Sequence, residues 1–94
     1  MKKYESMLIL NADQEEAARK TNLQTLLDVL TNNGATNMTV NEWGIRELAY
    51  EINKQKRGYY VLINYEANNS GLIKEFNRVC GINENVVRYL TINL

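Results

Sequence analysis

The sequence contains no histidine and a single cysteine, Cys80. Serine–histidine–aspartate triads, cysteine–histidine dyads and zinc sites depend on these two residue types, so all three are excluded. The carboxylates are scattered along the chain, and no glycine-rich loop is present to hold a phosphate. We therefore expect neither an enzyme nor a site for a metal, a cofactor or a small-molecule substrate.

An excess of charge and long apolar runs are missing as well. Eleven lysine and arginine residues balance eleven aspartate and glutamate residues, whereas a domain that binds nucleic acid alone usually carries a basic excess. Any contact with RNA should therefore use a local patch, with help from a partner. No apolar run approaches the roughly 18 residues that span a bilayer, and no charged-then-apolar leader opens the chain. We expect a cytoplasmic protein without a membrane segment.

What is present is the composition of a folded domain, with 45% hydrophobic and 23% charged residues. The 94 residues are enough for one domain, spanning 1–94. Apolar patterning predicts strands at 1–10, 36–43, 59–65 and 85–94, and the second strand continues past a bulge at Gly44 to residue 52. With a helix between the first and second strands and another between the third and fourth, the order is β-α-β-β-α-β. This order predicts an α+β ferredoxin-like sandwich, with two helices on one face of a four-stranded antiparallel sheet.

Each predicted helix carries one apolar stripe and ends at a glycine. We expect Asp13 to cap the first helix, with Glu16 as its capping-box partner, and Gly34 to take the left-handed conformation after it. The second helix follows the polar segment 68–70 and stops at Gly81. The stripes consist of Leu23, Leu26, Leu27 and Leu30 in the first helix and of Leu72, Ile73, Phe76, Val79 and Cys80 in the second.

The face of the sheet that the helices leave open is predicted to be apolar. An antiparallel sheet normally exposes polar residues on such a face. Here the first and third strands carry apolar residues at odd and even positions alike, so both of their faces are apolar. Scattered surface hydrophobes are the simpler explanation, and a face covered by a protein partner is the preferred one. The candidate partner-facing residues are Met7, Ile9, Tyr60, Leu62, Leu90 and Ile92.

Basic residues gather around the predicted hairpin between the second and third strands. Their charged groups can reach phosphates, and a tyrosine among them can stack on an unpaired base. A hairpin that is merely solvated explains the same composition, and nearby glutamates dilute the patch. The candidate RNA-binding residues are Lys2, Lys3, Arg46, Tyr50, Asn53, Lys54, Lys56, Arg57 and Arg88. We expect Trp43 to pack at the end of its strand rather than to stack on a base.

Four segments, in this order along the chain, resemble the bacterial small-subunit ribosomal protein six family: 1–7, 42–54, 58–60 and 82–89. The most specific is the stretch from Gly44 to Ile52, which contains Arg46 and the tripeptide Leu48-Ala49-Tyr50. The resemblance implies a ferredoxin-like protein of the small subunit's central domain, or platform. It also implies a heterodimer with small-subunit ribosomal protein eighteen that binds 16S ribosomal RNA cooperatively.

The sequence departs from the family's pattern at three positions of the hairpin. Ile45 and Glu47 stand where the family more often has basic residues, and Glu51 where it usually has proline, so fewer phosphate contacts are expected there. The alternative class is a stand-alone module that self-associates through the same sheet face, although we expect any homo-oligomer to be weak. An acylphosphatase-like enzyme is disfavoured because the first strand-to-helix turn, Asn11-Ala12-Asp13, is acidic and unsuited to an anion.

Overall fold

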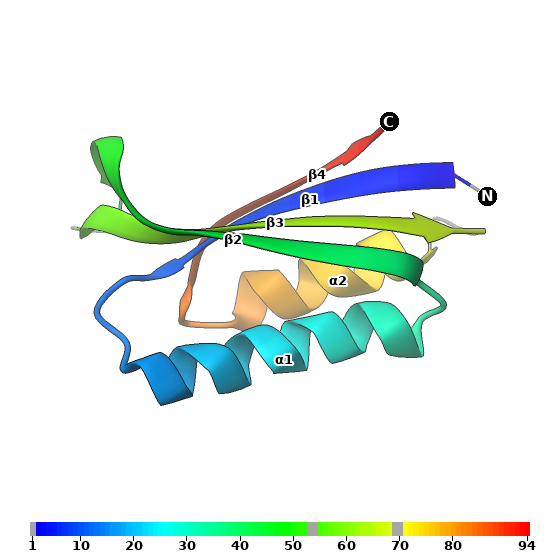
Figure 1. Ribbon diagram of the computed structural model, residues 1–94, viewed down its shortest axis with the longest axis horizontal. Coiled ribbons are helices and arrows are strands. Elements are labelled where there is room, and N and C mark those ends of the chain that lie inside the picture. The colour runs from blue at the N-terminus through cyan, green and yellow to red at the C-terminus, as the bar shows by residue number, and fades with distance from the viewer. Residues whose placement is uncertain (1, 53–54, 69–70) are drawn as a thin grey trace.

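The computed structural model describes residues 2–52, 55–68 and 71–94, with the backbone alone for residues 49–52 and 55. Its elements are β1 (Lys2–Asn11), α1 (Glu16–Asn32), β2 (Thr36–Ile52), β3 (Gln55–Ala67), α2 (Gly71–Ile82) and β4 (Val86–Asn93). The strands form one antiparallel sheet in the order β2-β3-β1-β4, and both helices lie against one of its faces (Figure 1). The predicted element order and ferredoxin-like sandwich are confirmed. Neither of the described helices has the length and apolar character needed to cross a bilayer.

Helix α1 begins later than the sequence predicts. Its N-cap is Glu15, which makes no side-chain capping hydrogen bond, so the expected cap at Asp13 is wrong. The Asp13 backbone N–H instead donates to the Asn11 side chain at 2.9 Å. A side-chain turn of this kind offers the backbone a partner outside the helix, which delays the first helical turn.

The end of α1 follows the expectation. Gly34 has a φ of 99°, a conformation that only glycine adopts without strain. Its N–H donates to the carbonyl of Thr31, and the Ala35 N–H donates to that of Leu30. These two bonds form a Schellman motif, which turns the chain back toward the sheet, and both Leu30 and Ala35 are buried there.

Two other predicted boundaries differ from the structure. Helix α2 continues through Gly81 to Ile82, so Gly81 does not stop it. A Cβ at Gly81 would lie 3.2 Å from the hydroxyl at the end of the exposed Tyr89 side chain, a close contact that a small shift of this side chain relieves. Strand β3 begins at Gln55, within the segment predicted as a loop, because β2 and β3 form one long hairpin.

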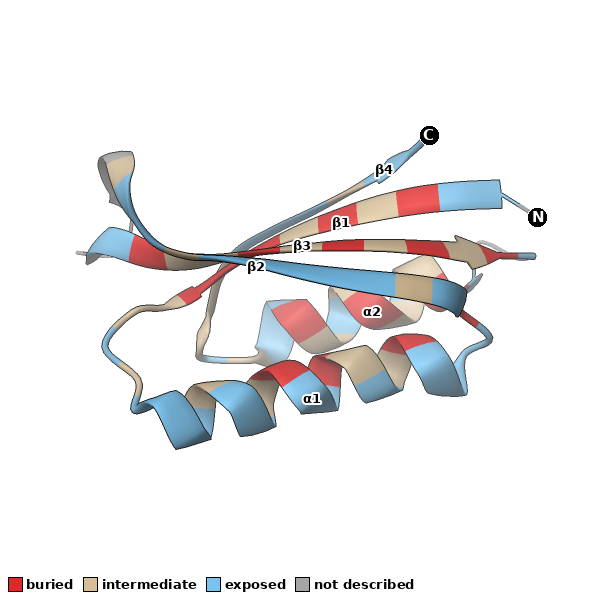
Figure 2. Ribbon diagram, in the orientation of Figure 1, coloured by how far each residue is buried: buried red, intermediate tan, exposed pale blue. Residues whose placement is uncertain are grey.

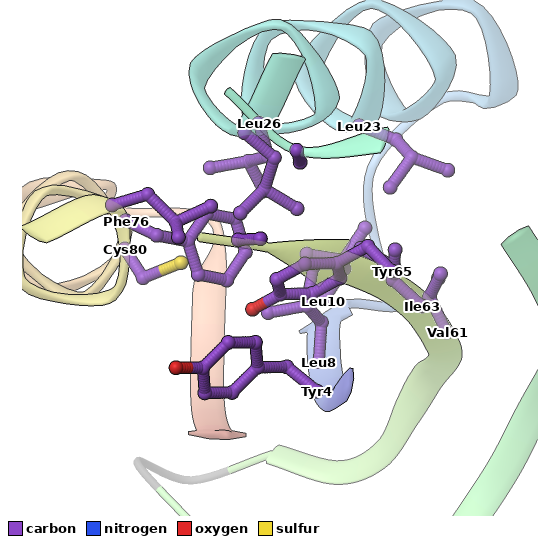
Figure 3. Packing of buried hydrophobic residues seen from close by; sticks show 14 residues of the cluster. Tyr4, Leu8, Leu10, Leu23, Leu26, Val61, Ile63, Tyr65, Phe76 and Cys80 are labelled. Atoms are coloured by element: carbon purple, nitrogen blue, oxygen red, sulfur yellow. The ribbon is translucent and has the colours of Figure 1, made fainter. Parts of the chain in front are cut away.

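The core fills the space between the helices and one face of the sheet. The side chains of Leu26 and Phe76, one from each helix, point toward the strands, where they meet residues such as Leu8 and Ile63 (Figure 3). All four are fully buried. Figure 2 shows the same pattern as alternating buried and partly exposed positions along β1 and β3. Both predicted helical stripes therefore face the sheet.

A cluster of three hydrogen-bonded hydroxyl groups lies within this mainly apolar layer. The Ser6 hydroxyl is 2.8 Å from that of Tyr65 and 2.7 Å from that of Thr91, which joins β1 to both of its neighbours. The ring of Tyr65 also stacks on Tyr4, with centroids 5.8 Å apart. Since Ser6 is completely buried, these partners are what make its hydroxyl tolerable in the core.

Candidate functional site

The pairing of the strands determines which side chains share the face that the helices leave open. Met7 on β1 pairs with Leu62 on β3 and with Leu90 on β4. Ile9 pairs with Tyr60, and Glu5 pairs with Ile92. Antiparallel partners project to the same side, so all six candidate partner-facing residues lie on this one face. We call it the open face.

Much of the open face is apolar and accessible. Leu90 is 50% exposed, Ile92 is 44% exposed, and Leu62 is partly exposed. They line a groove of about 350 Å³ together with Met7, Trp43 and Glu5, so all four strands contribute to its walls. Exposed apolar side chains that form a continuous surface are typical of an interface.

Ile9 differs from the other five candidates because it is only 3% exposed. An ideal Cβ at Gly58 would lie 2.3 Å from its Cγ2 atom, so Ile9 occupies the space that a side chain at Gly58 would need. A Leu48 methyl group lies 3.6 Å from the same Cβ position. The end of β2 bends away from the helices (Figure 1). Ile9 is therefore covered by its own chain and is unavailable to a partner.

Trp43 belongs to the open face, although the sequence did not indicate it. It is 48% exposed, and its ring lies parallel to that of Tyr60, with centroids 6.4 Å apart. The strand pairing shifts between Glu42 and Gly44, and Gly44 has a φ of 87°, which marks a bulge at this point. The predicted bulge at Gly44 was the available signal, since bulges redirect the side chains beside them.

The candidate RNA-binding residues fall into separate groups. Lys2 and Lys3 pair with Ala67 and Glu66, whereas Arg46 pairs with Gly58 at the other end of β3. Gly58 and Ala67 are nine positions apart on an extended strand, which is roughly 30 Å along the strand. One compact phosphate site cannot include both groups.

The hairpin carries the larger group. Arg46, Lys56 and Arg57 are exposed, and the latter two line a shallow hollow with Glu47 and Leu48. Glu47 stands directly across from Arg57, an arrangement that offsets part of the local positive charge. Of the other candidates here, Asn53 and Lys54 lie outside the described residues, as does the side chain of Tyr50.

Arg88 occupies an intermediate position. It is exposed and pairs with Ile9, so it stands on the open face between the apolar groove and the hairpin. Lys2, at the opposite end, lines a hollow with Lys74 of α2. Sequence reasoning missed Lys74 because its position beside β1 depends on how the helix packs.

One further cation, Arg19, is engaged on the helix side. Its guanidinium lies 4.0 Å from the centre of the Tyr59 ring. The Tyr59 hydroxyl donates to a Glu42 carboxylate oxygen at 3.1 Å. Partial burial is the main cause that raises the pKa of Tyr59 above its ordinary value, and the Glu42 carboxylate raises it further. These contacts join α1, β2 and β3, so we assign Arg19 and Tyr59 to the packing of the fold.

Comparisons with known proteins agree on one family. The sequence model of the family described as ribosomal protein S6 matches residues 3–93. Small ribosomal subunit protein bS6 of Halalkalibacterium halodurans is 51% identical over 90 residues, covering 96% of this chain and 94% of that protein. The crystal structure of 30S ribosomal protein S6 from Thermotoga maritima superposes with a TM-score of 0.89 over 99% of this chain and 87% of that one. Its sequence identity is 22%, so it supports the fold alone.

Proposed function

The chain belongs to the ribosomal protein S6 family of the small ribosomal subunit, which is not a family of enzymes, and from that premise we propose a more specific role. In this proposal the chain acts as one domain, binds small-subunit ribosomal protein eighteen through its open face, and binds 16S ribosomal RNA as part of that heterodimer. It does so in the cytoplasm, on the ribosome.

The observation that carries the proposal is the exposed apolar groove of the open face. Burying the exposed parts of Leu62, Leu90 and Ile92 stabilises a complex by about 25 cal/mol per Å² of apolar surface. In the isolated chain these exposed parts remain in water and gain no burial energy. A protein partner therefore gains binding energy here without disturbing the core.

The RNA-binding half of the proposal depends on the hairpin and on the partner together. The formal net charge of the chain is zero, and Glu47 faces Arg57 within the hairpin itself. Few phosphate contacts are available to the chain alone, so its own affinity for RNA should be weak. Joining two modest RNA-binding surfaces in one complex raises the overall affinity because the second surface binds at high effective concentration.

Binding to a 16S ribosomal RNA fragment of the platform, measured with and without protein eighteen, tests the proposal. We expect weak binding by either protein alone and a gain of about 100-fold or more for the pair. Tight binding by this chain alone, or no gain on adding protein eighteen, would contradict it. Sedimentation of the isolated chain tests the alternative, since a stable homodimer would favour a self-associating module.

A substitution in the hairpin tests its phosphate contacts. Arg57→Ala should weaken RNA binding by the heterodimer and reduce its salt dependence by roughly one counterion. Arg78→Ala, which removes an exposed arginine from α2 on the helix side of the sheet, is the matched control and should leave both quantities unchanged. Equal effects of the two substitutions would mean that the hairpin does not supply the phosphate contact.

A further inference from the structure

Glu5 is the one ionised side chain among the six residues that line the open-face groove. It lies beside Met7 along β1 and pairs across the sheet with Ile92 on one side and Asn64 on the other. Among the described residues, no side chain donates a hydrogen bond to Glu5 or forms an ion pair with it. Glu5 is partly exposed, so water reaches this side chain in the isolated chain.

Covering the groove would remove that water. A carboxylate that is buried against apolar groups without a partner is strongly unfavourable, and the Glu5 carboxylate would be surrounded by Met7, Ile92 and whatever covers them. The nearest cation on the same face of β1 is Lys3, which among the described residues forms no ion pair with Glu5 and does not line the groove. A molecule that covers the groove must therefore bring its own compensation for the charge.

We propose that Glu5 is a specificity-determining residue of the open face, which selects a partner segment that places a lysine or arginine among aliphatic side chains. The aliphatic groups pack on Met7, Leu62, Leu90 and Ile92, and the cation forms an ion pair with the Glu5 carboxylate. This inference depends on the proposed function, because it specifies the chemistry of the protein that the open face binds.

The charge of the chain supports a basic partner. A protein whose positive and negative charges balance adds little net attraction for RNA, so the basic excess of an RNA-binding pair must come from the other member. A partner of that composition has lysine and arginine available for Glu5. Acidic or purely apolar surfaces would leave the carboxylate uncompensated.

The same residue disfavours a second copy of this chain as the occupant. A symmetric contact through the open face presents the same surface twice, so it would bury two Glu5 carboxylates in one apolar interface. Each copy offers Lys3 and Arg88 at opposite ends of its open face, and neither lines the groove. Glu5 thereby opposes self-association and favours a different, basic protein.

The test compares Glu5→Gln with the unchanged chain in binding to protein eighteen, by isothermal titration calorimetry at several salt concentrations. Glutamine keeps the size of the side chain and removes its charge. We expect Glu5→Gln to weaken binding by roughly 5- to 30-fold and to reduce its salt dependence, and Glu5→Lys to weaken it at least a further tenfold. Glu84→Gln, which removes an exposed carboxylate outside the groove, is the matched control and should bind like the unchanged chain.

The outcomes separate this inference from the proposed function. If Glu5→Gln binds as tightly as the unchanged chain while Leu62→Asp abolishes binding, the open face is the interface and the role of Glu5 is wrong. If the unchanged chain does not bind protein eighteen, both proposals are wrong. Glu5→Gln should also increase self-association of the isolated chain in sedimentation, and an unchanged monomer would contradict the opposing role of Glu5. Thermal unfolding by circular dichroism verifies that each variant is folded.

Discussion

The two faces of the sheet are built from alternate residues of the same strands, yet they have different roles. On β3, Val61, Ile63 and Tyr65 lie beneath the helices and are buried, whereas Tyr60 and Leu62 between them remain partly exposed. Both sets are apolar, so hydrophobicity alone does not distinguish them. The difference is what covers each face: two helices of the same chain on one side, and another molecule in our proposal on the other. The helix-covered face therefore contributes most of the stability of the fold, and the open face is the proposed site of recognition.

The largest expected effect comes from placing the same charge on either face. Ile63→Asp buries a carboxylate in the core and should cost more than about 4 kcal/mol, enough to unfold a domain of this size. Leu62→Asp places the carboxylate on the open face and should change stability by about 1 kcal/mol or less while it prevents binding of the partner. Urea denaturation followed by circular dichroism measures both. An unfolded Leu62→Asp variant beside a folded Ile63→Asp variant would reverse the assignment of the faces.

A smaller effect is expected at Gly58, where the chain itself covers Ile9 on the open face. Gly58→Ala introduces a Cβ that would lie 2.3 Å from Ile9, and we expect a destabilisation of about 1–3 kcal/mol. Gly81→Ala is the control, because its Cβ meets only the Tyr89 hydroxyl and its helical position favours alanine. It should be neutral or slightly stabilising. Gly58→Ala should cost less in an Ile9→Ala background than in the unchanged chain, and purely additive effects would mean that the two residues do not compete for space.

The hydroxyl cluster on the helix side should respond by a slightly smaller amount. Ser6→Ala removes the partner of both Tyr65 and Thr91, and we expect a cost of about 1–2 kcal/mol in denaturant unfolding. Thr25→Ala on the exposed side of α1 removes a hydroxyl that water replaces, so its effect should stay within about 0.5 kcal/mol. Equal costs for the two variants would show that burial does not strengthen the Ser6 contacts.

The last expected effect is absent at neutral pH and appears only at alkaline pH. Burial raises the pKa of the Cys80 thiol from 9.0 to about 12. Between these values the unfolded chain loses the thiol proton while the folded chain keeps it, so the free energy of unfolding falls as pH rises. The contribution is fully present below about pH 9. Urea denaturation at pH 7 to 11 should show a decline that is shallower, though not absent, in Cys80→Ala. Burial also raises the pKa of Tyr65, which acts in the same direction, and equal slopes would exclude a role for Cys80.

Local patterns predicted the fold because several independent signals agreed. The stripes of α1 and α2, Gly34 at the end of α1 and the element order all indicate the same sandwich. The alternation in β3 also placed Leu62 and Ile63 on opposite faces, as the burial pattern shows. The errors occurred where one signal competed with another. Asp13 is a good cap by residue type, but the turn that Asn11 forms takes precedence.

The candidate surfaces were harder to predict because they depend on contacts between distant residues. Ile9 has the right parity for the open face, but its burial depends on Gly58 and Leu48, some fifty and forty positions further along the chain. Trp43 needed knowledge of the shift in pairing beside Gly44. The basic candidates appeared as one set, whereas the length of β3 separates Lys2 and Lys3 from the hairpin. The residue types identified these side chains as candidates, but only the pairing of the strands shows where they lie relative to one another.

The Ser6 cluster also has a consequence for how the last strand is added during folding. Its contacts join residues 59 and 85 positions apart, so they form only when β3 and β4 both lie beside β1 in the native alignment. If β4 slipped by one residue, Leu90 and Ile92 would turn toward the helices and Thr91 would leave Ser6 without one of its partners. The misaligned state would lack this buried hydrogen bond, which raises its free energy. The buried Ser6 contacts thus favour the alignment of β4 that keeps Leu90 and Ile92 on the open face, which another molecule is proposed to recognise.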